Sequence, residues 1–342
     1  MGSLLGDKRG LGGDPRGKEA RPLSVSALVC TRDRPGELRR AIASVLRTEF
    51  SRFELLVVDS SRGPHTQRIV ERFRSLDKRI RYLRSNRTGL SAARNLAIAK
   101  VSAELVVFTD DDCVVKRGWL GAMVRAFEAD EEAGLAWGEV IPARDVSSDG
   151  FIVGCHIEQY RGVKGKSRSR RFRFTARPSG GIGANMAVRR KVVIGLGGFD
   201  PALGPGGQFF ACVDGDMTVR CLLEGYHVYE SKESYVYHHG IRDWEEERSS
   251  MRRAWFGIGA AYVKPLKCGR WGALPVLLYE FLQGAVLPFL WATLTFRRPK
   301  GWLRVNSFLR GALQGWRTPV DRQNILFRFD SEDNDGYARL HD

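Results

Sequence analysis

The sequence predicts an α/β fold in which helices flank a mostly parallel central sheet. Short apolar segments rich in β-branched residues recur between residues 25 and 140. Between them, apolar residues repeat with helical spacing. Strands that alternate with helices favour a parallel sheet with right-handed crossovers. A long apolar segment near the C-terminus adds a helical extension that we expect to be partly membrane-associated.

The individual elements follow from these patterns. We expect strands at residues 25–30, 53–58, 80–83, 105–108, 135–140 and 230–239. We expect helices around 38–46, 69–73, 88–100, 119–127 and 213–226. In the first of these helices, Leu38, Ala41, Ile42, Val45 and Leu46 form one apolar face. Ser91 is the expected N-terminal cap of the helix at 88–100.

The charge of the chain points to an anionic partner. Its 342 residues carry a formal net charge of +16, which suits nucleic acid, a phospholipid surface or a phosphorylated substrate. The stretch 161–177 holds eight basic residues and no acid, and we expect an exposed loop there. Six cysteines without a CxxC pair argue against a structural zinc site and fit the reduced thiols of a cytosolic setting.

An acidic triplet follows the apolar strand at 105–108. Side chains alternate along a strand, so Asp110 and Asp112 are expected on the same side. Open α/β sheets bind ligands at the carboxyl ends of parallel strands. Two carboxylates there can hold a hard divalent cation such as Mg²⁺ or Mn²⁺, which in turn holds phosphate. The alternative is a solvated acidic turn.

Two further groups are candidates for a site. Asp214 and Asp216 open the expected helix at 213–226, although acids at a helix start also serve as caps and dipole partners. His238 and His239 end the last expected strand. Histidines are more often core or surface residues than ligands, and only their position at a strand end distinguishes these two.

The chain divides into four parts by composition. Residues 1–22 are expected to form a disordered tail, 23–240 the α/β domain, 241–320 a helical region and 321–342 a polar tail. Within the helical region, the apolar segment 272–296 contains one charged residue, Glu280. It fits a helix that lies at or re-enters a membrane interface, a single membrane span, or a soluble core helix.

An ordered set of motifs between residues 23 and 240 resembles the family 2 glycosyltransferases with the GT-A fold. The set comprises the Thr31–Arg34–Pro35 turn, Asp59, RTGLSAARN (87–95), FTDDDC, GANMAVRR, GGFDP, VDGDM and the strand-end histidines. The resemblance implies a GT-A-like domain that binds a nucleotide-sugar donor together with a divalent metal, Mn²⁺ or Mg²⁺. It also implies transfer of the sugar to a hydroxyl acceptor in a single inverting displacement.

The resemblance assigns roles to individual residues. Thr31, Arg34, Asp59, Arg94, Asp110 and Asp111 are expected to bind the donor. Asp112 is expected to hold the metal, with His238 or His239 approaching from the other side. Asp214 matches the general base that deprotonates the acceptor hydroxyl. Because Val213 stands where the family often has Glu, Asp216 is the alternative base.

Other classes of protein explain less of the sequence. A nucleotidyltransferase would show a Gly-rich phosphate loop at the first strand turn, and TRDRPGE is not one. The basic residues occur without a motif that reads DNA or RNA. The alternatives kept are an inactive glycosyltransferase-like binding protein and a basic membrane- or nucleic-acid-binding protein.

The expected partners and location follow from the charge and the apolar segment. We expect an enzyme of envelope or surface-glycan synthesis, with a glycan or lipid-linked acceptor and no nucleic acid. An anionic membrane surface attracts basic residues beside an apolar segment. The expected location is therefore the cytoplasmic face of a membrane.

Overall fold

The computed structural model describes residues 23–143, 151–152, 168–170, 181–242, 244–295 and 301–328. The expected tail at 1–22 lies outside the described residues, as do residues 329–342. Most of the basic stretch 161–177 also lies outside them. Its residues Arg168–Arg170 form a strand, so the expected loop is wrong at these three positions.

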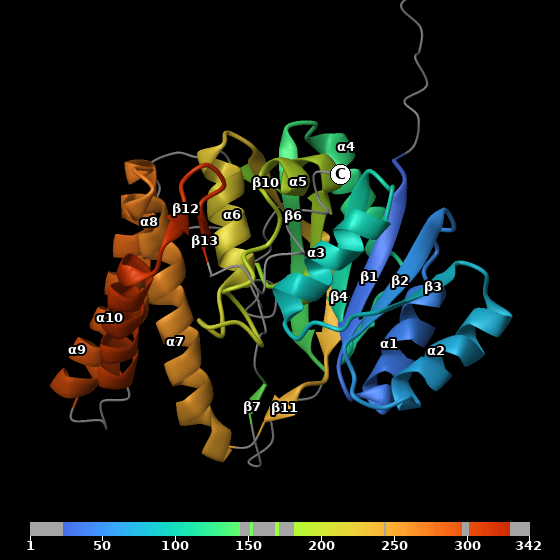
Figure 1. Ribbon diagram of the computed structural model, residues 1–342, viewed down its shortest axis with the longest axis horizontal. Helices are drawn as coiled ribbons and strands as arrows, with labels where there is room; N and C mark the ends of the chain where they lie inside the picture. The colour runs from blue at the N-terminus through green and yellow to red at the C-terminus, as the bar shows by residue number, and fades with distance from the viewer. Residues whose placement is uncertain are drawn as a thin grey trace, which may run out of the picture.

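A mixed sheet of nine strands lies at the centre of the described part of the chain (Figure 1). Its strands are β1 (Val25–Thr31), β2 (Phe53–Asp59), β3 (Ile80–Arg84), β4 (Leu105–Asp110), β5 (Cys113–Val115), β6 (Ala133–Pro142), β8 (Arg168–Arg170), β9 (Met186–Arg189) and β10 (His227–His238). Their order is β3-β2-β1-β4-β9-β6-β10-β5, and β8 pairs with β10. Two short pairs lie apart: β7 (Phe151–Ile152) with β11 (Ile241–Arg242), and β12 (Val320–Asp321) with β13 (Leu326–Phe327).

The sheet has two parallel parts. β1 is parallel to β2 and β4, and β2 is parallel to β3. β6 is parallel to β10. β9 is antiparallel to both β4 and β6 and joins the two parts. The expected α/β architecture is confirmed, while β5, β8 and β9 add antiparallel pairings that the alternation of strands and helices did not predict.

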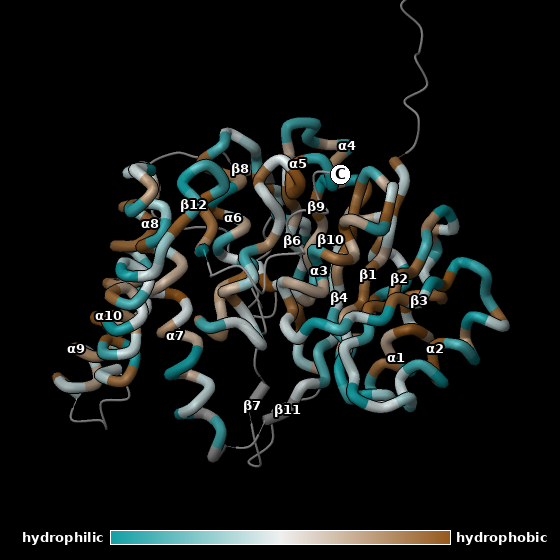
Figure 2. The backbone as a smooth tube through the Cα atoms, viewed as in Figure 1, coloured by the Kyte–Doolittle hydropathy of each residue, from teal (hydrophilic) through white to brown (hydrophobic). Residues whose placement is uncertain are grey.

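Helices cover both faces of the sheet because each presents one apolar face to it. The helices are α1 (Pro35–Leu46), α2 (His65–Leu76), α3 (Leu90–Lys100), α4 (Trp119–Ala129), α5 (Arg190–Gly195) and α6 (Val213–Leu223). α1, α2 and α4 enclose one apolar core with the sheet. α3, α5 and α6 enclose the other. Figure 2 shows how hydrophobic residues concentrate in the central strands between these layers.

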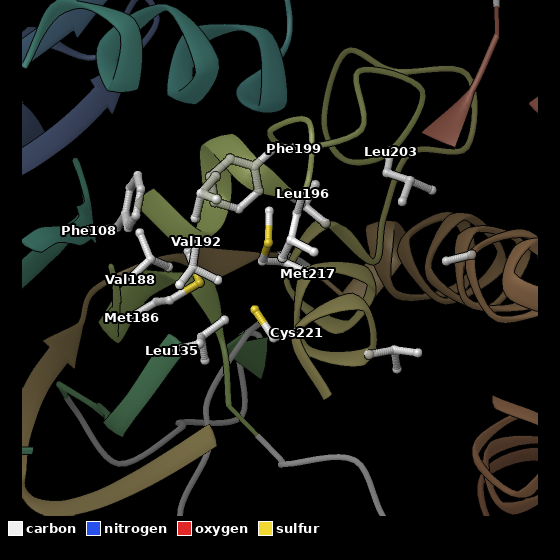
Figure 3. Packing of buried hydrophobic residues seen from close by; sticks show 14 of the residues in the cluster. Phe108, Leu135, Met186, Val188, Val192, Leu196, Phe199, Leu203, Met217 and Cys221 are labelled. Carbon is white, nitrogen blue, oxygen red and sulfur yellow. The ribbon is translucent and has the colours of Figure 1, made fainter. Parts of the chain in front are cut away.

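The core under α3, α5 and α6 links the acidic strand to helix α6. Phe108 of β4 meets Phe199 edge-to-face, with ring centroids 5.6 Å apart, and Met217 of α6 lies in the same cluster (Figure 3). Buried aromatic pairs in this arrangement add about 0.5–1.5 kcal/mol to the effect of area burial alone. This packing fixes the end of β4 relative to the start of α6, where Asp214 stands.

A layer of helices forms the side of the molecule away from α1 and α2 (Figure 1). It contains α7 (Trp244–Lys267), α8 (Leu274–Tyr279), the π-helical turn η3 (Glu280–Val286), α9 (Leu287–Leu294) and α10 (Gly301–Arg317). The continuous stretch Trp271–Leu294 is long and apolar enough to cross a membrane, with a mean hydropathy of 1.6, and 17% of its apolar window is buried. Ala260 and Ala261 of α7 belong to the main core. The division of the chain at residue 240 stays a prediction.

Two local expectations are wrong. Ser91 does not cap α3, because the helix begins at Leu90 after Gly89, and the Ser91 hydroxyl instead donates to the backbone carbonyl of Leu203 at 3.0 Å. Gly89 has φ +121°, a conformation that glycine adopts without strain. The last strand ends at His238, so His239 lies one residue beyond it.

Candidate functional site

Three carboxylates gather where β4 ends. β4 stops at Asp110, which pairs in register with Cys30 near the end of β1. Because the chain turns there, strand alternation does not extend to Asp112. Asp110, Asp111 and Asp112 all line one cavity of about 460 Å³, together with residues of β1, of the turn after it and of α3.

Asp111 connects this acidic triplet to the first strand. Thr31 donates a hydrogen bond of 2.7 Å to Oδ2 of Asp111, and Arg34 reaches its Oδ1 at 3.3 Å. The same Arg34 nitrogen lies 3.0 Å from Oδ2 of Asp112. Arg34 is half-exposed, so it bridges two carboxylates and still faces the cavity. Thr31 and Arg34, which the sequence predicts to bind the donor, thus line the same cavity as the acidic triplet, and their contact with a donor stays a prediction.

Two members of the triplet, Asp110 and Asp111, have raised pKa values. Desolvation raises the pKa of Asp110 to about 6, although the nearby Arg94 guanidinium lowers it. Desolvation likewise raises the pKa of Asp111 to about 6, against the hydrogen bond from Thr31 and the charge of Arg34. Both carboxyl groups therefore hold a proton up to a higher pH than ordinary aspartates do. Residues with shifted pKa values cluster at functional sites.

Asp112 faces a histidine across the cavity. Nε2 of His238 lies 3.4 Å from Oδ1 of Asp112, and the thiol of Cys113 is close to the same oxygen. Possible ligand atoms of Asp112, Cys113 and His238 lie within 4.8 Å of one another. His239 is tied to the same residue by its backbone, since its N–H donates to the carbonyl of Asp112 at 2.9 Å.

A carboxylate and an imidazole so placed fit a divalent cation. Both suit first-row metals such as Mn²⁺. Cys113 fits less well as a ligand, because burial raises the pKa of its thiol well above the ordinary value and keeps it protonated. Of the two candidate histidines, His238 is the one whose imidazole faces Asp112.

Asp214 stands at the first turn of α6 and is held on both oxygens. Nη1 of Arg94 donates to its Oδ1 at 2.8 Å, and the backbone N–H of Gly183 donates to its Oδ2 at 2.9 Å. Its side chain is 25% exposed. Arg94 itself is buried, with its guanidinium over the rings of Phe108 and Phe199. The contact of Arg94 with a nucleotide stays a prediction; its partners in the structure are Asp214 and the carbonyl of Gly183.

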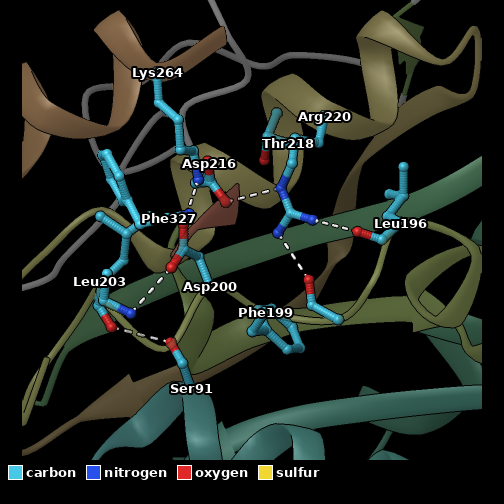
Figure 4. Close-up of polar contacts among 12 residues, drawn as sticks. Ser91, Leu196, Phe199, Asp200, Leu203, Asp216, Thr218, Arg220, Lys264 and Phe327 are labelled. Atoms are coloured by element: carbon cyan, nitrogen blue, oxygen red, sulfur yellow. Dashed lines mark hydrogen bonds and ion pairs between the residues drawn. The ribbon is translucent and has the colours of Figure 1, made fainter. Parts of the chain in front are cut away.

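Asp216 lies in a different environment two residues later. Its Oδ2 accepts from Nε of Arg220 at 2.9 Å, and its Oδ1 lies 2.7 Å from Nζ of Lys264 on α7 (Figure 4). Lys264 also bonds Asp200 at 2.6 Å. All four side chains are at most 1% exposed. Asp216 therefore belongs to a buried network of two acids and two bases, hereafter the ionic cluster.

Asp59 is also an interior residue. Its carboxylate accepts from the backbone N–H of Ser61 at 2.8 Å, from the Tyr82 hydroxyl at 2.8 Å and from Arg84 at 3.1 Å. The side chain is fully buried, while its neighbour Ser60 lines the cavity. Direct contact between Asp59 and a nucleotide stays a prediction, and its partners show that it shapes the turn after β2.

Two groups at the site were not predicted from the sequence. Gly183, in the motif GANMAVRR, supplies the N–H that orients Asp214, and a Cβ there would collide with Asp214 and Arg94. Gly240 approaches Asp112 and His238 just as closely. The signal for both was a glycine beside a candidate residue, but such glycines are common in turns and do not identify a site alone.

Comparison with known proteins gives a family. The model of the glycosyl transferase family 2 matches residues 26–197, just over half of the chain. A glucosyl-dolichyl phosphate glucuronosyltransferase from Haloferax volcanii is 22% identical over 202 residues, 54% of this chain and 59% of that protein. A GalNAc(5)-diNAcBac-PP-undecaprenol beta-1,3-glucosyltransferase from Campylobacter jejuni is 28% identical over 103 residues, 30% of this chain and 33% of that protein. The alignments thus cover less than two thirds of each relative.

Solved structures share the fold at low sequence identity. A mannosyltransferase from Pyrobaculum calidifontis, in complex with GDP-Man and Mn²⁺, superposes with a TM-score of 0.58 at 17% identity, covering 87% of this chain and 88% of that one. TarS 1–349 from S. aureus, in complex with UDP-GlcNAc, gives a TM-score of 0.57 at 15% identity, covering 85% and 82%. The expected GT-A-like fold is confirmed. Since the family model spans half of the chain, this protein belongs to glycosyl transferase family 2.

Proposed function

We propose that this protein transfers a sugar from a nucleoside-diphosphate sugar to a hydroxyl acceptor, with Asp214 as the general base. The observation that carries the proposal is a partly exposed carboxylate, fixed on both oxygens, near a cavity lined by three further carboxylates. Asp110 and Asp214 are close enough for the charge of Asp214 to contribute to the raised pKa of Asp110. Base and donor site thus belong to one centre.

The geometry of Asp214 suits a base. Each carboxylate oxygen has two lone pairs, so one hydrogen bond per oxygen leaves capacity to accept a proton from an acceptor hydroxyl. Arg94 and Gly183 hold the group in one orientation, which lowers the cost of positioning it for the reaction. Asp216 has no such access, because Arg220 and Lys264 engage it in the interior. We therefore assign the base to Asp214.

The nucleotide-sugar donor would bind in the cavity that the acidic triplet lines. We propose that Asp112 and His238 hold a divalent cation, Mn²⁺ or Mg²⁺, and that Thr31, Arg34, Asp110 and Asp111 surround the nucleotide. When bound, such a cation neutralises the negative charge that develops on the leaving diphosphate. Support comes from the Pyrobaculum mannosyltransferase, which was solved with GDP-Man and Mn²⁺. A single base that acts on the acceptor hydroxyl corresponds to a single, inverting displacement.

The acceptor proposal rests on relatives and on surface composition. The names of the Haloferax and Campylobacter relatives include a dolichyl phosphate and an undecaprenol diphosphate. We propose a lipid-linked glycan acceptor in envelope or surface-glycan synthesis, reached from the cytoplasmic face, where nucleotide sugars are made. The apolar stretch Trp271–Leu294 supports membrane association, and no nucleic-acid partner is proposed.

A donor assay tests the proposal. The purified protein is incubated with a panel of nucleotide sugars and Mn²⁺, and release of the nucleoside diphosphate is measured. We expect hydrolysis or transfer with at least one donor, loss of most of it in EDTA, and loss of most of it in Asp112→Asn. Asp77→Asn is the matched control, since Asp77 pairs with Arg79 at the surface, away from the cavity. Undiminished rates in EDTA and in Asp112→Asn would contradict the assignment of the metal.

A further inference from the structure

Exposed apolar side chains concentrate on one part of this molecule. Of the fifteen large hydrophobic residues that are exposed in the described part of the chain, eleven lie between Trp271 and Trp316. They point outward from α8, η3 and α9 and from α10. A contiguous group of exposed apolar side chains typically marks a surface that binds a protein or a membrane. We call the outward side of residues 271–295 and 301–316 the docking face.

The helix α10 contributes four of these eleven residues, although its sequence is not apolar enough to suggest a membrane segment. Trp302, Leu309, Leu313 and Trp316 are each about half exposed. At about 100° per residue these four positions fall within an arc of about 60°. Arg310 and Arg317, both exposed, follow the second and fourth of them and flank the stripe on one side.

The inner side of the same hairpin packs on α7, because Phe308 of α10 meets Trp255 with ring centroids 6.4 Å apart and the guanidinium of Arg304 lies over the Trp255 ring at 5.7 Å. Within the hairpin, Phe281 packs against the same Phe308 with ring centroids 5.0 Å apart. Arg304 of α10 donates to the carbonyl of Gly284 at 3.3 Å. A membrane span would have to leave this packing, so the apolar stretch is one half of a two-helix layer with a single free side.

The basic residues near the docking face favour an anionic membrane as its partner. Residues 297–317, which comprise α10 and the segment before it, contain six basic residues and no acidic one, and the docking face as a whole holds one acid, Glu280. A protein partner of ordinary composition does not require such an imbalance, whereas an anionic lipid surface attracts it. Four tryptophans, at 271, 291, 302 and 316, are exposed together with leucines on this face, as is typical of amphipathic helices that lie in the interface plane.

We infer that the docking face lies in the plane of an anionic membrane, inserted from one side, and that α10 takes part in the contact together with the stretch Trp271–Leu294. Leucines of both helices would enter the acyl boundary, and Arg310 and Arg317 would reach the phosphates. This inference deepens the proposed membrane association and rests on it. In this arrangement the helices attach to one leaflet only, and the stretch Trp271–Leu294 does not span the membrane.

The test uses the full chain and preformed vesicles of phosphatidylcholine with about 30% phosphatidylglycerol. The double variant Leu309→Glu, Leu313→Glu places charge on α10 alone, and we expect its vesicle binding to fall about tenfold or more. Leu76→Glu is the matched control, because Leu76 is an 85% exposed leucine on α2, outside the docking face. It should bind as wild type does. Salt at about 0.5 M should weaken wild-type binding, because it screens the basic residues.

Two further readouts separate the alternatives. Lipids brominated near the headgroup should quench tryptophan fluorescence more than lipids brominated at the chain ends, and the reverse order would indicate a span. Nucleotide-sugar hydrolysis in solution should be equal in all variants, so that loss of donor chemistry and loss of docking are distinguishable. Wild-type vesicle binding by the double variant would overturn the inference. A vesicle-independent dimer that the double variant dissolves would assign the face to a second copy instead.

Discussion

Asp214 and Asp216 stand two residues apart on α6, yet their neighbours give them different tasks. Asp214 is held by one guanidinium and one backbone N–H and keeps a quarter of its surface exposed. Asp216 is enclosed between Arg220 and Lys264. A buried charge without its partner is strongly destabilising, and both aspartates pair with a buried cation, so what distinguishes Asp214, the proposed base, is its exposed surface.

Replacing these residues should separate the two roles. Asp214→Asn should lower turnover by ~10²- to 10⁴-fold, because general base catalysis is lost, and leave donor affinity near its wild-type value. Asp216→Asn should instead lower the free energy of unfolding by about 3–5 kcal/mol, because it removes a carboxylate from between two buried cations. Single-turnover rates and urea unfolding measure the two effects. A stable, inactive Asp216→Asn protein would reverse the assignment.

Asp111 should make stability depend on pH in the absence of metal. Its pKa is about 6 in the folded protein, against 3.8 for an ordinary aspartate. Between these values the unfolded chain binds fewer protons than the folded one, so stability falls as pH rises. The expected loss is about 3 kcal/mol from below about pH 4 to above about pH 6.

The variant Asp111→Asn isolates this contribution. The variant lacks the titrating group. The unfolding free energy of the wild type minus that of the variant should therefore fall by about 3 kcal/mol as the pH rises over the same range. Urea unfolding in EDTA, repeated at several pH values, measures it. A difference that stays constant with pH would show that the carboxyl ionises normally in the folded state.

At the scale of elements, the turn before β9 determines how α6 presents Asp214, the proposed base. Gly183 lies in a short 3-10 turn (Gly183–Asn185), and its N–H reaches Asp214 because no side chain stands between them. Trp119 of α4 anchors the same turn through a 2.8 Å hydrogen bond to Asn185. The turn is thus fixed from both faces of the sheet.

Gly183→Ala should therefore impair catalysis without unfolding the protein. The added methyl group would displace the carboxylate of Asp214 or the guanidinium of Arg94. A misplacement of this kind can cost about a hundredfold in turnover. Gly36→Ala is the control, since its Cβ would meet nothing within 4 Å. Both variants should unfold cooperatively by circular dichroism, and only the first should lose turnover.

At the scale of the whole molecule, the ionic cluster attaches the helical layer to the sheet domain. Lys264 comes from α7, Asp216 and Arg220 from α6, and Asp200 from the loop before it. Asp200 also accepts the backbone N–H of Phe327 in β13 at 2.9 Å. The positioning of α6 thus depends on segments well beyond the region that the family model matches, residues 26–197.

Lys264→Met should reveal this dependence. The change leaves Asp200 and Asp216 in the interior with only Arg220 as a charged partner, and we expect the free energy of unfolding to fall by about 3–5 kcal/mol. Lys191→Met, at an exposed position of α5, should change it little. Chemical denaturation of both variants measures the difference. Equal stability of the two would show that α7 attaches through its apolar contacts alone.

The sequence alone determined the main parallel strands, the helices between them and the location of the candidate site. Runs of apolar residues in β1, β2 and β4 and the one-sided pattern of α1 are local, and local spacing decides whether a segment can bury one face or two. The acidic triplet follows β4 directly, so its place at the carboxyl edge of the sheet could be predicted from the chain order. The ordered motifs also gave the family.

Only the tertiary structure decided what each polar residue binds. Arg94 and Asp214 are 120 residues apart in the sequence, and Lys264 and Asp200 are 64 apart. Local periodicity cannot predict contacts over such sequence separations. The two aspartates of VDGDM are equivalent as letters, but burial of one and exposure of the other depend on α7. The docking face likewise emerges only when α10 packs beside α9, because its four outward residues are interspersed with polar ones along the chain. Which distant polar groups contact each other depends on the packing of the whole chain. These contacts could therefore not be predicted from local sequence.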